Sequence, residues 1–246
     1  MFGTNEDIPM DQRVCRAIAK VRDEMKAAGK HNMPLFWTEW NVPGMNQSRD
    51  TTYVGAALAN TVRQCDGMVD MMSFWTFSDV FEEGGPGPRP FIGQFGLRAE
   101  FGINKPSYYG FALLHKLGDQ RISNNSHDVI VTKNDRGDLI IAAWNLVDPD
   151  PASMSKAKTQ TIKFTVRNAK PDTQALIERV DNEHSNVIPA YKSIGQPTYP
   201  TPEQVEKLNQ ATALSPPESA RIANGELSIK LEPNALVLIT IPEFQH

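Results

Sequence analysis

Residues 34–41, "PLFWTEWN", and residues 67–81, "GMVDMMSFWTFSDVF", decide the fold of the first half of this chain. Both are apolar runs with little alternation, which is typical of strands that are covered on both faces. A helical pattern at residues 51–64 separates them, and Asp50 stands before it as a possible N-cap. The order strand, helix, strand predicts two parallel strands joined by a crossover helix.

Two further helices are predicted around this unit. Apolar residues recur at spacings of three and four over residues 14–25, and Gly29 follows as a plausible C-terminal stop. Pro106 suits the first position of another helix, which Gly118 closes. Residues 1–118 are therefore predicted to form one α/β domain.

From about Arg121 the apolar period changes from helical to alternating. The turn signals at 135–137 and at Asn224–Gly225 separate runs of alternating residues, and Thr201 begins a capping-box pattern for one intervening helix. The alternating runs are 128–147, 159–166, 174–180, 225–232 and 235–241. This half, residues 119–246, is predicted to be an antiparallel β-sandwich domain.

Composition excludes several classes of protein. The 246 residues are 40% hydrophobic and 22% charged, with a net charge of −4 and no basic block, so nucleic acid is not an expected partner. No segment approaches the roughly 18 apolar residues of a membrane span, so no membrane partner is expected. Neither a glycine-rich phosphate loop nor a pairing of histidines is present, and no cofactor or metal is expected.

Cys15 and Cys65 offer neither a disulfide framework nor the spacing of metal ligands. Both fall in helical patterns, which predicts two ordinary buried thiols. Unpaired thiols favour a reducing compartment such as the cytoplasm.

Acidic and aromatic residues follow both strands of the first half. Glu39 lies between two tryptophans at the end of the first run, and Trp75, Asp79, Glu82 and Glu83 follow the second. In parallel α/β folds, chemistry gathers at the carboxyl ends of strands. Carboxylates beside indole rings suit a sugar, whose C–H faces pack on rings while its hydroxyls donate to carboxylates. For Asp79 alone, an exposed loop residue or an N-cap is the simpler interpretation.

Several motifs resemble glycoside hydrolase family 39, the β-xylosidases. They are "FWTEWN" at 36–41, "SFWTFSDVFEEGG" at 73–85, "GQFGL" at 93–97 and "INKPSYYGFALLHKLG" at 103–118. The resemblance covers residues 3–118, and the sandwich follows in the family's order. It implies the C-terminal part of a (β/α)8 TIM barrel, about strands 7 and 8 with flanking helices, followed by an antiparallel β-sandwich.

The resemblance also implies roles for individual residues. Glu39 matches the catalytic nucleophile of enzymes that hydrolyse β-xylosides with retention. Trp75 and the pair Glu82–Glu83 match positions that line the pocket of the bound xylose, with Glu83 preferred as the direct sugar ligand. The expected substrate is a xylo-oligosaccharide or another β-xyloside.

One part of the family pattern is missing. The acid/base residue of the family lies in an Asn-Glu-Pro motif on barrel strand 4, whereas the Glu-Pro of this chain, Glu232–Pro233, follows Leu231 in the final hairpin. The chain is therefore expected to begin inside the barrel and to be inactive alone. An incomplete barrel should also leave open strand edges and exposed apolar faces.

Two alternatives remain open. An α-L-iduronidase-like hydrolase of the same family would need cations for a uronate carboxylate, and Arg89 and Arg98 are the nearby candidates. A non-catalytic carbohydrate-binding fragment would need an exposed aromatic row, for which the second half offers Trp144, Tyr191 and Tyr199. The oligomeric state is left open.

Overall fold

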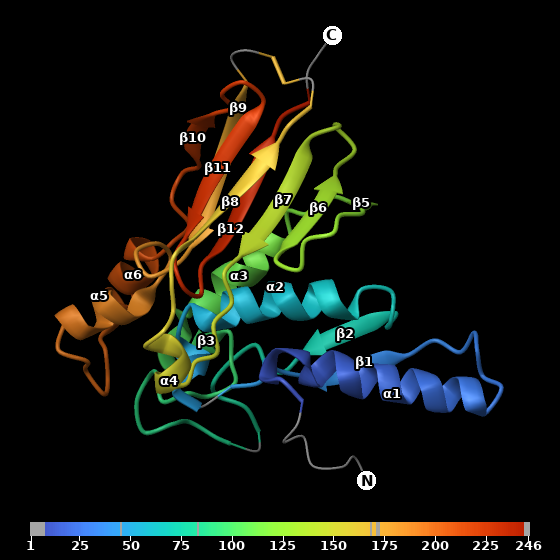
Figure 1. The fold of residues 1–246 in the computed structure, drawn as a ribbon. Helices are drawn as coiled ribbons and strands as arrows, with labels where there is room; N and C mark the ends of the chain where they lie inside the picture. Colours follow the sequence, from blue (N-terminus) through green and yellow to red (C-terminus); the bar gives the residue numbers. More distant parts are fainter. Residues whose placement is uncertain (1–7, 45, 83, 168, 171–172, 244–246) are drawn as a thin grey trace.

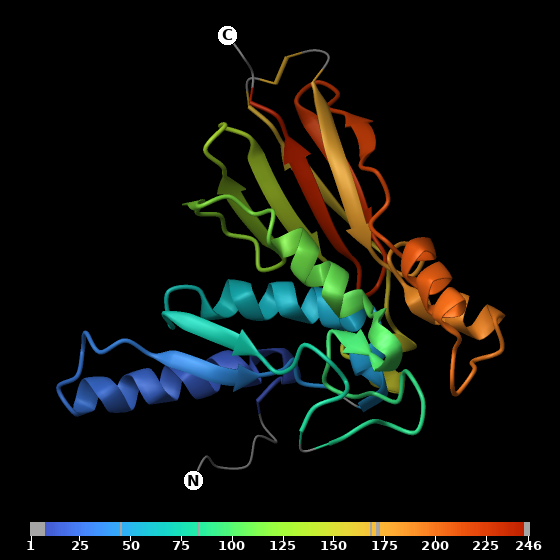
Figure 2. The same cartoon turned by 180° about the vertical axis from the view of Figure 1, so that it is seen from behind.

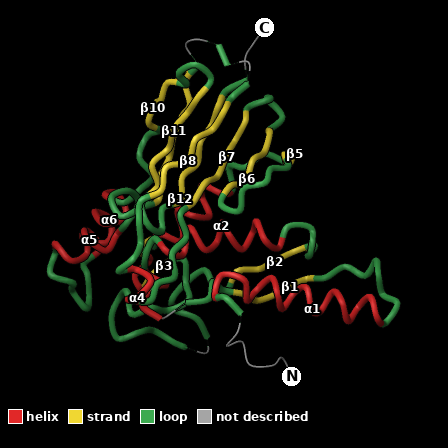
Figure 3. The backbone as a smooth tube through the Cα atoms, in the orientation of Figure 1, coloured by secondary structure: helices red, strands yellow, loops and turns green. Residues whose placement is uncertain are grey.

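The protein is described from a computed structural model, which covers residues 8–44, 46–82, 84–167, 169–170 and 173–243. Figure 1 shows a sheet-rich half next to the C-terminus and a mixed helix and strand half next to the N-terminus, with the described ends of the chain on opposite sides of the molecule. Figure 3 shows the same division by secondary structure. Within these residues, no helix has both the length and the apolar character needed to cross a bilayer.

The first half contains the predicted parallel pair. Strands β1 (Phe36–Trp40) and β2 (Met71–Phe74) pair in parallel, and helix α2 (Tyr53–Cys65) connects them. Helix α1 (Arg13–Ala27) follows the short 3-10 helix η2 (Met10–Gln12), and a second 3-10 turn, η3 (Asn46–Asp50), precedes α2. Helix α3 (Pro106–Leu114) follows a small hairpin of β3 (Arg98–Ala99), the 3-10 turn η4 (Glu100–Gly102) and β4 (Ile103–Asn104).

The second half is antiparallel throughout its described ladders. A six-stranded sheet has the order β10-β9-β12-β7-β6-β5, and a separate pair is formed by β11 and β8. The strands are β5 (Gln120–Ile122), β6 (Val129–Lys133), β7 (Leu139–Trp144), β8 (Gln160–Thr165), β9 (Gln174–Val180), β10 (Glu218–Arg221), β11 (Glu226–Leu231) and β12 (Leu236–Ile241). Helices α4 (Pro151–Met154), α5 (Val187–Ser193) and α6 (Pro202–Ala211) lie in the connections.

The central strands β6, β7 and β12 of the large sheet are buried on both faces because their side chains alternate between two cores. Ile141, Ile177 and Ile239 face the β8–β11 pair and pack with Ile229 of β11. The other face packs against α2 and α3, as Figures 1 and 2 show from opposite sides. This second core includes Ala56 and Ala59 of α2, Tyr109 and Leu113 of α3, and Ile140, Ala142, Trp144 and Leu238 of the sheet. Helices α2 and α3 therefore join the antiparallel sheet to the β1–β2 pair.

The two cysteines form a disulfide, so the prediction of two separate thiols is wrong. Helices α1 and α2 pack side by side, and this brings the Cα atoms of Cys15 and Cys65 to 5.1 Å, although 50 positions separate them in sequence. The bond lies in a buried cluster with Ile18. The preference for a reducing compartment, which rested on unpaired thiols, loses its basis.

The structure confirms two of the local signals at helix ends and corrects a third. Thr201 and Gln204 form the expected capping box of α6, and Pro106 occupies the first turn of α3. Asp50 is not the N-cap of α2, because Thr52 occupies that position and Asp50 is buried against a lysine. The Asp50 carboxylate therefore makes a tertiary contact with a lysine and does not cap a helix.

The β1–β2 pair is covered on one face only. Trp37 and Phe74 pack with the helices, whereas Phe36 and Met71 are 55% and 60% exposed on the other face. Large apolar side chains of both strands are therefore exposed on that face.

Candidate active site

A local irregularity in β1 determines where Glu39 points. The register to β2 shifts between Trp37 and Trp40, and both indoles pack into the cluster on the α2 side. Two residues of the same face separated by three positions require one extra residue in the strand, as in a β-bulge. Thr38 and Glu39 are consequently both exposed, on the face away from α2.

Because of this geometry, the two indoles that flank Glu39 pack in the core and do not line the same face as the carboxylate. Trp40 is only 7% exposed and meets Phe74 edge-on at 5.4 Å, and Phe74 meets Phe111 of α3 at 5.2 Å. Trp40 therefore anchors the end of β1 to the helices, and this packing fixes the backbone that carries Glu39.

The aromatic surface beside this strand end is built around Trp75. The indole of Trp75 meets the rings of Phe81 at 4.8 Å and Phe95 at 5.1 Å. The backbone N–H of Trp75 donates to the carbonyl of Trp40 at 2.8 Å, so Trp75 lies directly beside the end of β1. The peptide bond between Trp75 and Thr76 is cis.

Asn41, the residue after Trp40, ties these segments together. Its Nδ2 donates to the carbonyl of Trp75 at 2.7 Å and to the carbonyl of Phe95 at 3.0 Å. One amide thus joins the end of β1, the end of β2 and the loop that carries Phe95. The first two segments also bear the predicted site residues Glu39 and Trp75.

A buried ion cluster fixes the loops behind this surface. Lys105 is fully buried, and its Nζ lies 2.7 Å from Oδ1 of Asp79 and 2.7 Å from Oδ1 of Asp50. The same carboxylates accept backbone N–H bonds from the loop, Asp79 from Gly96 at 2.7 Å and Asp50 from Gly93 at 2.6 Å. The loop of Phe95 is therefore held from both sides.

Burial dominates the protonation of Asp79. Removal of its carboxyl group from water raises its pKa to about 6, against the opposing effects of Lys105 and the Gly96 N–H. Asp79 is fully buried, so it is neither the exposed loop residue nor the N-cap that the sequence suggested. Its close contact with Gly96 leaves no space for a side chain there, since an added Cβ would lie 2.3 Å from the Asp79 nitrogen.

Only one member of the acidic pair after β2, Glu82, belongs to the described residues. Glu82 is exposed in the turn that follows Phe81, next to the Trp75 surface. Glu83, the preferred sugar ligand, lies outside the described residues. The structure thus brings Glu39, Trp75 and the segment of Glu82 to the same end of the β1–β2 pair.

The loop at residues 84–90 is anchored by another buried carboxylate. Glu100 is 4% exposed and accepts a hydrogen bond from the backbone N–H of Gly87 at 3.0 Å. This contact holds the loop against the small hairpin of β3 and β4.

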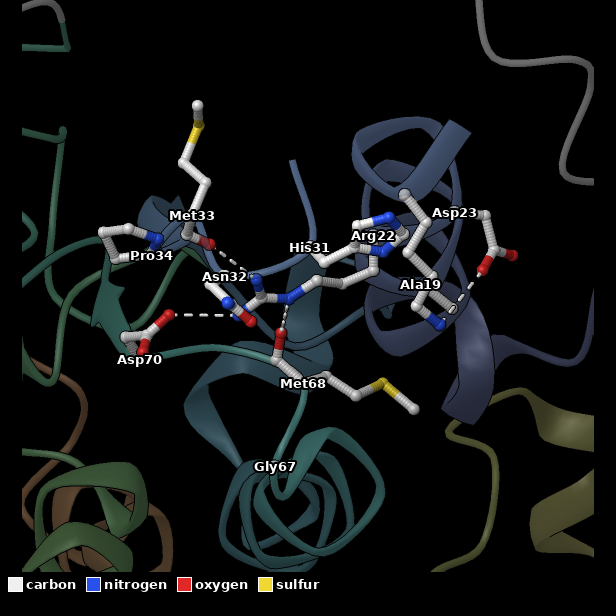
Figure 4. Close-up of a pocket in the computed structure, with 11 residues that line it drawn as sticks. Ala19, Arg22, Asp23, His31, Asn32, Met33, Pro34, Gly67, Met68 and Asp70 are labelled. Carbon is white, nitrogen blue, oxygen red and sulfur yellow. Dashed lines mark hydrogen bonds and ion pairs between the residues drawn. The ribbon is translucent and has the colours of Figure 1, made fainter. Parts of the chain in front are cut away.

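A cavity of about 500 Å³ lies at the opposite, amino-terminal ends of β1 and β2 (Figure 4). Arg22 of α1 dominates it, donating to the carbonyls of Met68 at 2.6 Å and Met33 at 2.9 Å and pairing with Asp70 at 3.0 Å. These bonds tie α1 to the segments that enter both strands. The Arg22 guanidinium is therefore engaged in structural contacts. The cavity lies at the opposite end of the β1–β2 pair from Glu39, so it is not part of the candidate active site.

No sequence pattern indicated a role for Asn41 or Lys105, and none revealed the pairing of Asp50 with Lys105. Lys105 precedes a predicted helix, and nothing in its neighbours indicates complete burial. Its two partners come from distant segments, so only the fold reveals the cluster. Among the described residues, no group of three or more His, Cys, Asp and Glu could hold a metal ion.

Residues 4–224 match the sequence profile of the glycosyl hydrolases family 39, and the chain belongs to this family. A β-xylosidase from Caldicellulosiruptor saccharolyticus is 30% identical over 222 residues, which cover 85% of this chain and 44% of the relative. A β-xylosidase from Geobacillus stearothermophilus is 31% identical over 218 residues, covering 86% of this chain and 42% of the relative. The chain thus spans less than half the length of these curated relatives.

The fold is similar to that of a monomeric β-xylosidase from Caulobacter crescentus CB15. The two structures share 25% sequence identity with a TM-score of 0.82, and the match covers 96% of this chain and 51% of the other. The mixed helix and sheet architecture with antiparallel sheets is therefore that of a known family fold.

Proposed function

We propose that this chain is the C-terminal portion of a retaining β-xylosidase, with Glu39 as the nucleophile. The family membership and the β-xylosidases among its relatives support the reaction class. The single structural observation that carries the assignment is the bulge in β1, which turns Glu39 out of the helix-packed face at the carboxyl end of the strand. Bulges next to active sites commonly re-aim a side chain in this way.

In this proposal, β1 and β2 are strands 7 and 8 of a (β/α)8 barrel, and residues 1–118 and 119–246 are its barrel portion and its β-sandwich. Earlier barrel strands would cover the exposed face that carries Phe36 and Met71. They would also supply the acid/base carboxyl, which Glu232 does not match, since it pairs with Lys230 at 2.8 Å beside the final hairpin.

The reaction then proceeds by two displacements. The Glu39 carboxylate attacks the anomeric carbon, the glycosidic C–O bond breaks, and the departing oxygen takes a proton from an acid about 5–5.5 Å from the nucleophile. Water next attacks the glycosyl-enzyme, gives its proton to the same acid/base group and releases xylose with Glu39 restored. The exposed position of Glu39 allows it to meet a sugar that is held against the Trp75 surface.

Trp75, Glu82 and Glu83 would hold the sugar. The Trp75 indole, which meets Phe81 edge-on and Phe95 at a tilt, would offer an apolar face for the pyranose ring. The glutamates would accept hydrogen bonds from sugar hydroxyls, Glu83 as the direct ligand. Of the two cations considered for the uronate-binding alternative, Arg98 already has a partner, since its Nη2 donates to the carbonyl of Gly102 at 2.6 Å.

The test uses the whole enzyme of which this chain would be the C-terminal part. Glu39→Ala should abolish turnover of an aryl xyloside, and added azide should restore part of it as a glycosyl azide of inverted configuration. A small anion can occupy the space of the missing carboxylate, and an activated aryl group leaves without much assistance.

A matched control is Glu226→Ala, which removes an exposed carboxylate from β11 in the other half of the chain and should leave turnover unchanged. An azide product of retained configuration would assign Glu39 as the acid/base instead. Undiminished turnover of the Glu39 variant, or hydrolysis by residues 1–246 alone, would refute the proposal.

A further inference from the structure

Two aromatic rings lie exposed on the surface between η4 and the α5–α6 connection. Tyr199 is 80% exposed and Phe101 is 50% exposed, and their rings meet edge-on with centroids 6.4 Å apart. Beside them lies a cavity of about 860 Å³, whose apolar wall includes Pro200, Pro202 and Val205. We call this surface the Phe101–Tyr199 platform.

The platform is held in place by the backbone around Phe101. Phe101 has φ +63°, a left-handed conformation that is unfavourable for a bulky side chain and persists only where the surroundings impose it. Asn209 of α6 fixes the backbone that follows Phe101, because its Oδ1 accepts from the N–H of Asn104 at 2.8 Å and its Nδ2 donates to the carbonyl of Gly102 at 3.1 Å. The fold thus accepts a strained backbone that leaves an aromatic ring half exposed, an arrangement that a bound ligand would explain.

The polar groups at the platform match a neutral, hydroxyl-rich ligand. Glu206 and Gln210 lie one helical turn apart on α6, both exposed, and line the cavity with Phe101. Their side chains are joined by a hydrogen bond of 2.9 Å, which orients a carboxylate and an amide together. Rings that pack on C–H faces, next to groups that accept and donate to hydroxyls, are the combination that binds a pyranose. The carboxylate disfavours an anionic ligand.

Arg98 links the platform to the segment that follows β2. Phe77, in the segment after β2, is 58% exposed, and the Arg98 guanidinium lies 6.0 Å from its ring centroid. The same guanidinium donates to Gly102, the residue after Phe101. The half-buried Arg98 therefore contacts both the segment that follows Trp75 and the turn that carries Phe101.

We propose that the Phe101–Tyr199 platform is a second sugar-binding site, which binds xylose units of a xylan chain at a distance from the bond that is cleaved. The choice of xylose rests on the proposed function, whereas the site itself rests on the platform geometry.

Titration of the 246-residue chain with xylohexaose tests this proposal by calorimetry. Tyr199→Ala and Phe101→Gly should each weaken binding about three- to tenfold, because each removes a ring on which a sugar C–H face would pack. Tyr199 is too exposed for its removal to affect folding, and glycine suits the backbone at position 101, so Phe101→Gly should not lower the melting temperature. Ile194→Ala, at a 38% exposed apolar position after α5, is the matched control and should bind normally.

The outcomes separate this proposal from the proposed function. Glu39→Gln should leave platform binding unchanged. If Tyr199→Ala binds normally while Trp75→Ala loses binding, the platform is refuted and the proposed site stands. If the platform binds cellohexaose but not xylohexaose, the xylan assignment is refuted. If Tyr199→Ala instead abolishes self-association in sedimentation and no sugar binds, the platform is a contact between copies of the chain.

Discussion

Removal of the Cys15–Cys65 disulfide should destabilise the folded protein by about 4 kcal/mol. The cysteines are 50 positions apart, and a cross-link that closes a loop of this length lowers the entropy of the unfolded chain by about 14 cal/mol/K in the chain-entropy relation. At 25 °C this entropy corresponds to about 4 kcal/mol. For a chain of this size, such a loss lowers the melting temperature by about 10 °C.

The predicted measurement is urea unfolding of Cys15→Ala, Cys65→Ala and the double variant. Each single variant should lose most of the 4 kcal/mol, and the second substitution should add little, because one bond is lost in all three proteins. Dithiothreitol should bring the wild type close to the double variant and should leave the variants nearly unchanged.

Loss of the disulfide should also affect the candidate active site, because the bond fastens α1 to α2. Both helices pack with the strand that carries Glu39. Two thiols titrated in the unfolded, unreduced wild type would refute the disulfide. Additive losses in the two single variants would refute the reasoning, because they would show that the two side chains contribute separately.

Three further outcomes follow from the contacts around the site. Lys105→Met should cost about 3–5 kcal/mol in urea unfolding because it leaves two buried carboxylates without a cation; a loss below 1 kcal/mol would contradict this role. The pKa of Asp79 is about 6 in the folded protein and 3.8 in its reference state, so the folded state holds an extra proton and its contribution to stability falls as pH rises from about 4 to 6. Asp79→Asn should remove this pH dependence, and parallel stability curves for wild type and variant would refute it. Asn41→Ala leaves two carbonyls without their donor and should cost about 1–3 kcal/mol with a changed near-ultraviolet tryptophan spectrum.

Local patterns predicted the elements that local forces determine. The capping box at Thr201 and the proline that opens α3 satisfy backbone groups within one turn, so the sequence alone reveals them. The second strand was predicted too long, because the apolar run at 67–81 continues after β2 into the loop of Trp75. Trp75 and Phe81, in that part of the run, contact each other edge-on and do not form a strand.

Long-range pairings were the part that sequence could not supply. Cys15 and Cys65 meet because two helices pack, and no spacing rule relates them. Asp50 has the residue type and position of an N-cap, yet the lysine that it binds lies in a distant segment. Local chemistry assigned Asp50 to the nearest helix, and the tertiary fold gave it a different partner.

The position of Glu39 shows how these two levels combine. A regular strand would place Glu39 and Trp37 on one face, and Thr38 and Trp40 on the other. The register shift between Trp37 and Trp40 breaks this alternation, so both indoles can anchor the strand in the helix-packed core while Thr38 and Glu39 remain accessible. In the proposed site, the aromatic wall for a sugar would then come from Trp75, which the backbone bond to Trp40 and the bridge from Asn41 hold beside the end of β1. The two tryptophans beside Glu39 therefore position the carboxylate, and the tryptophan of the neighbouring strand end would contact the substrate.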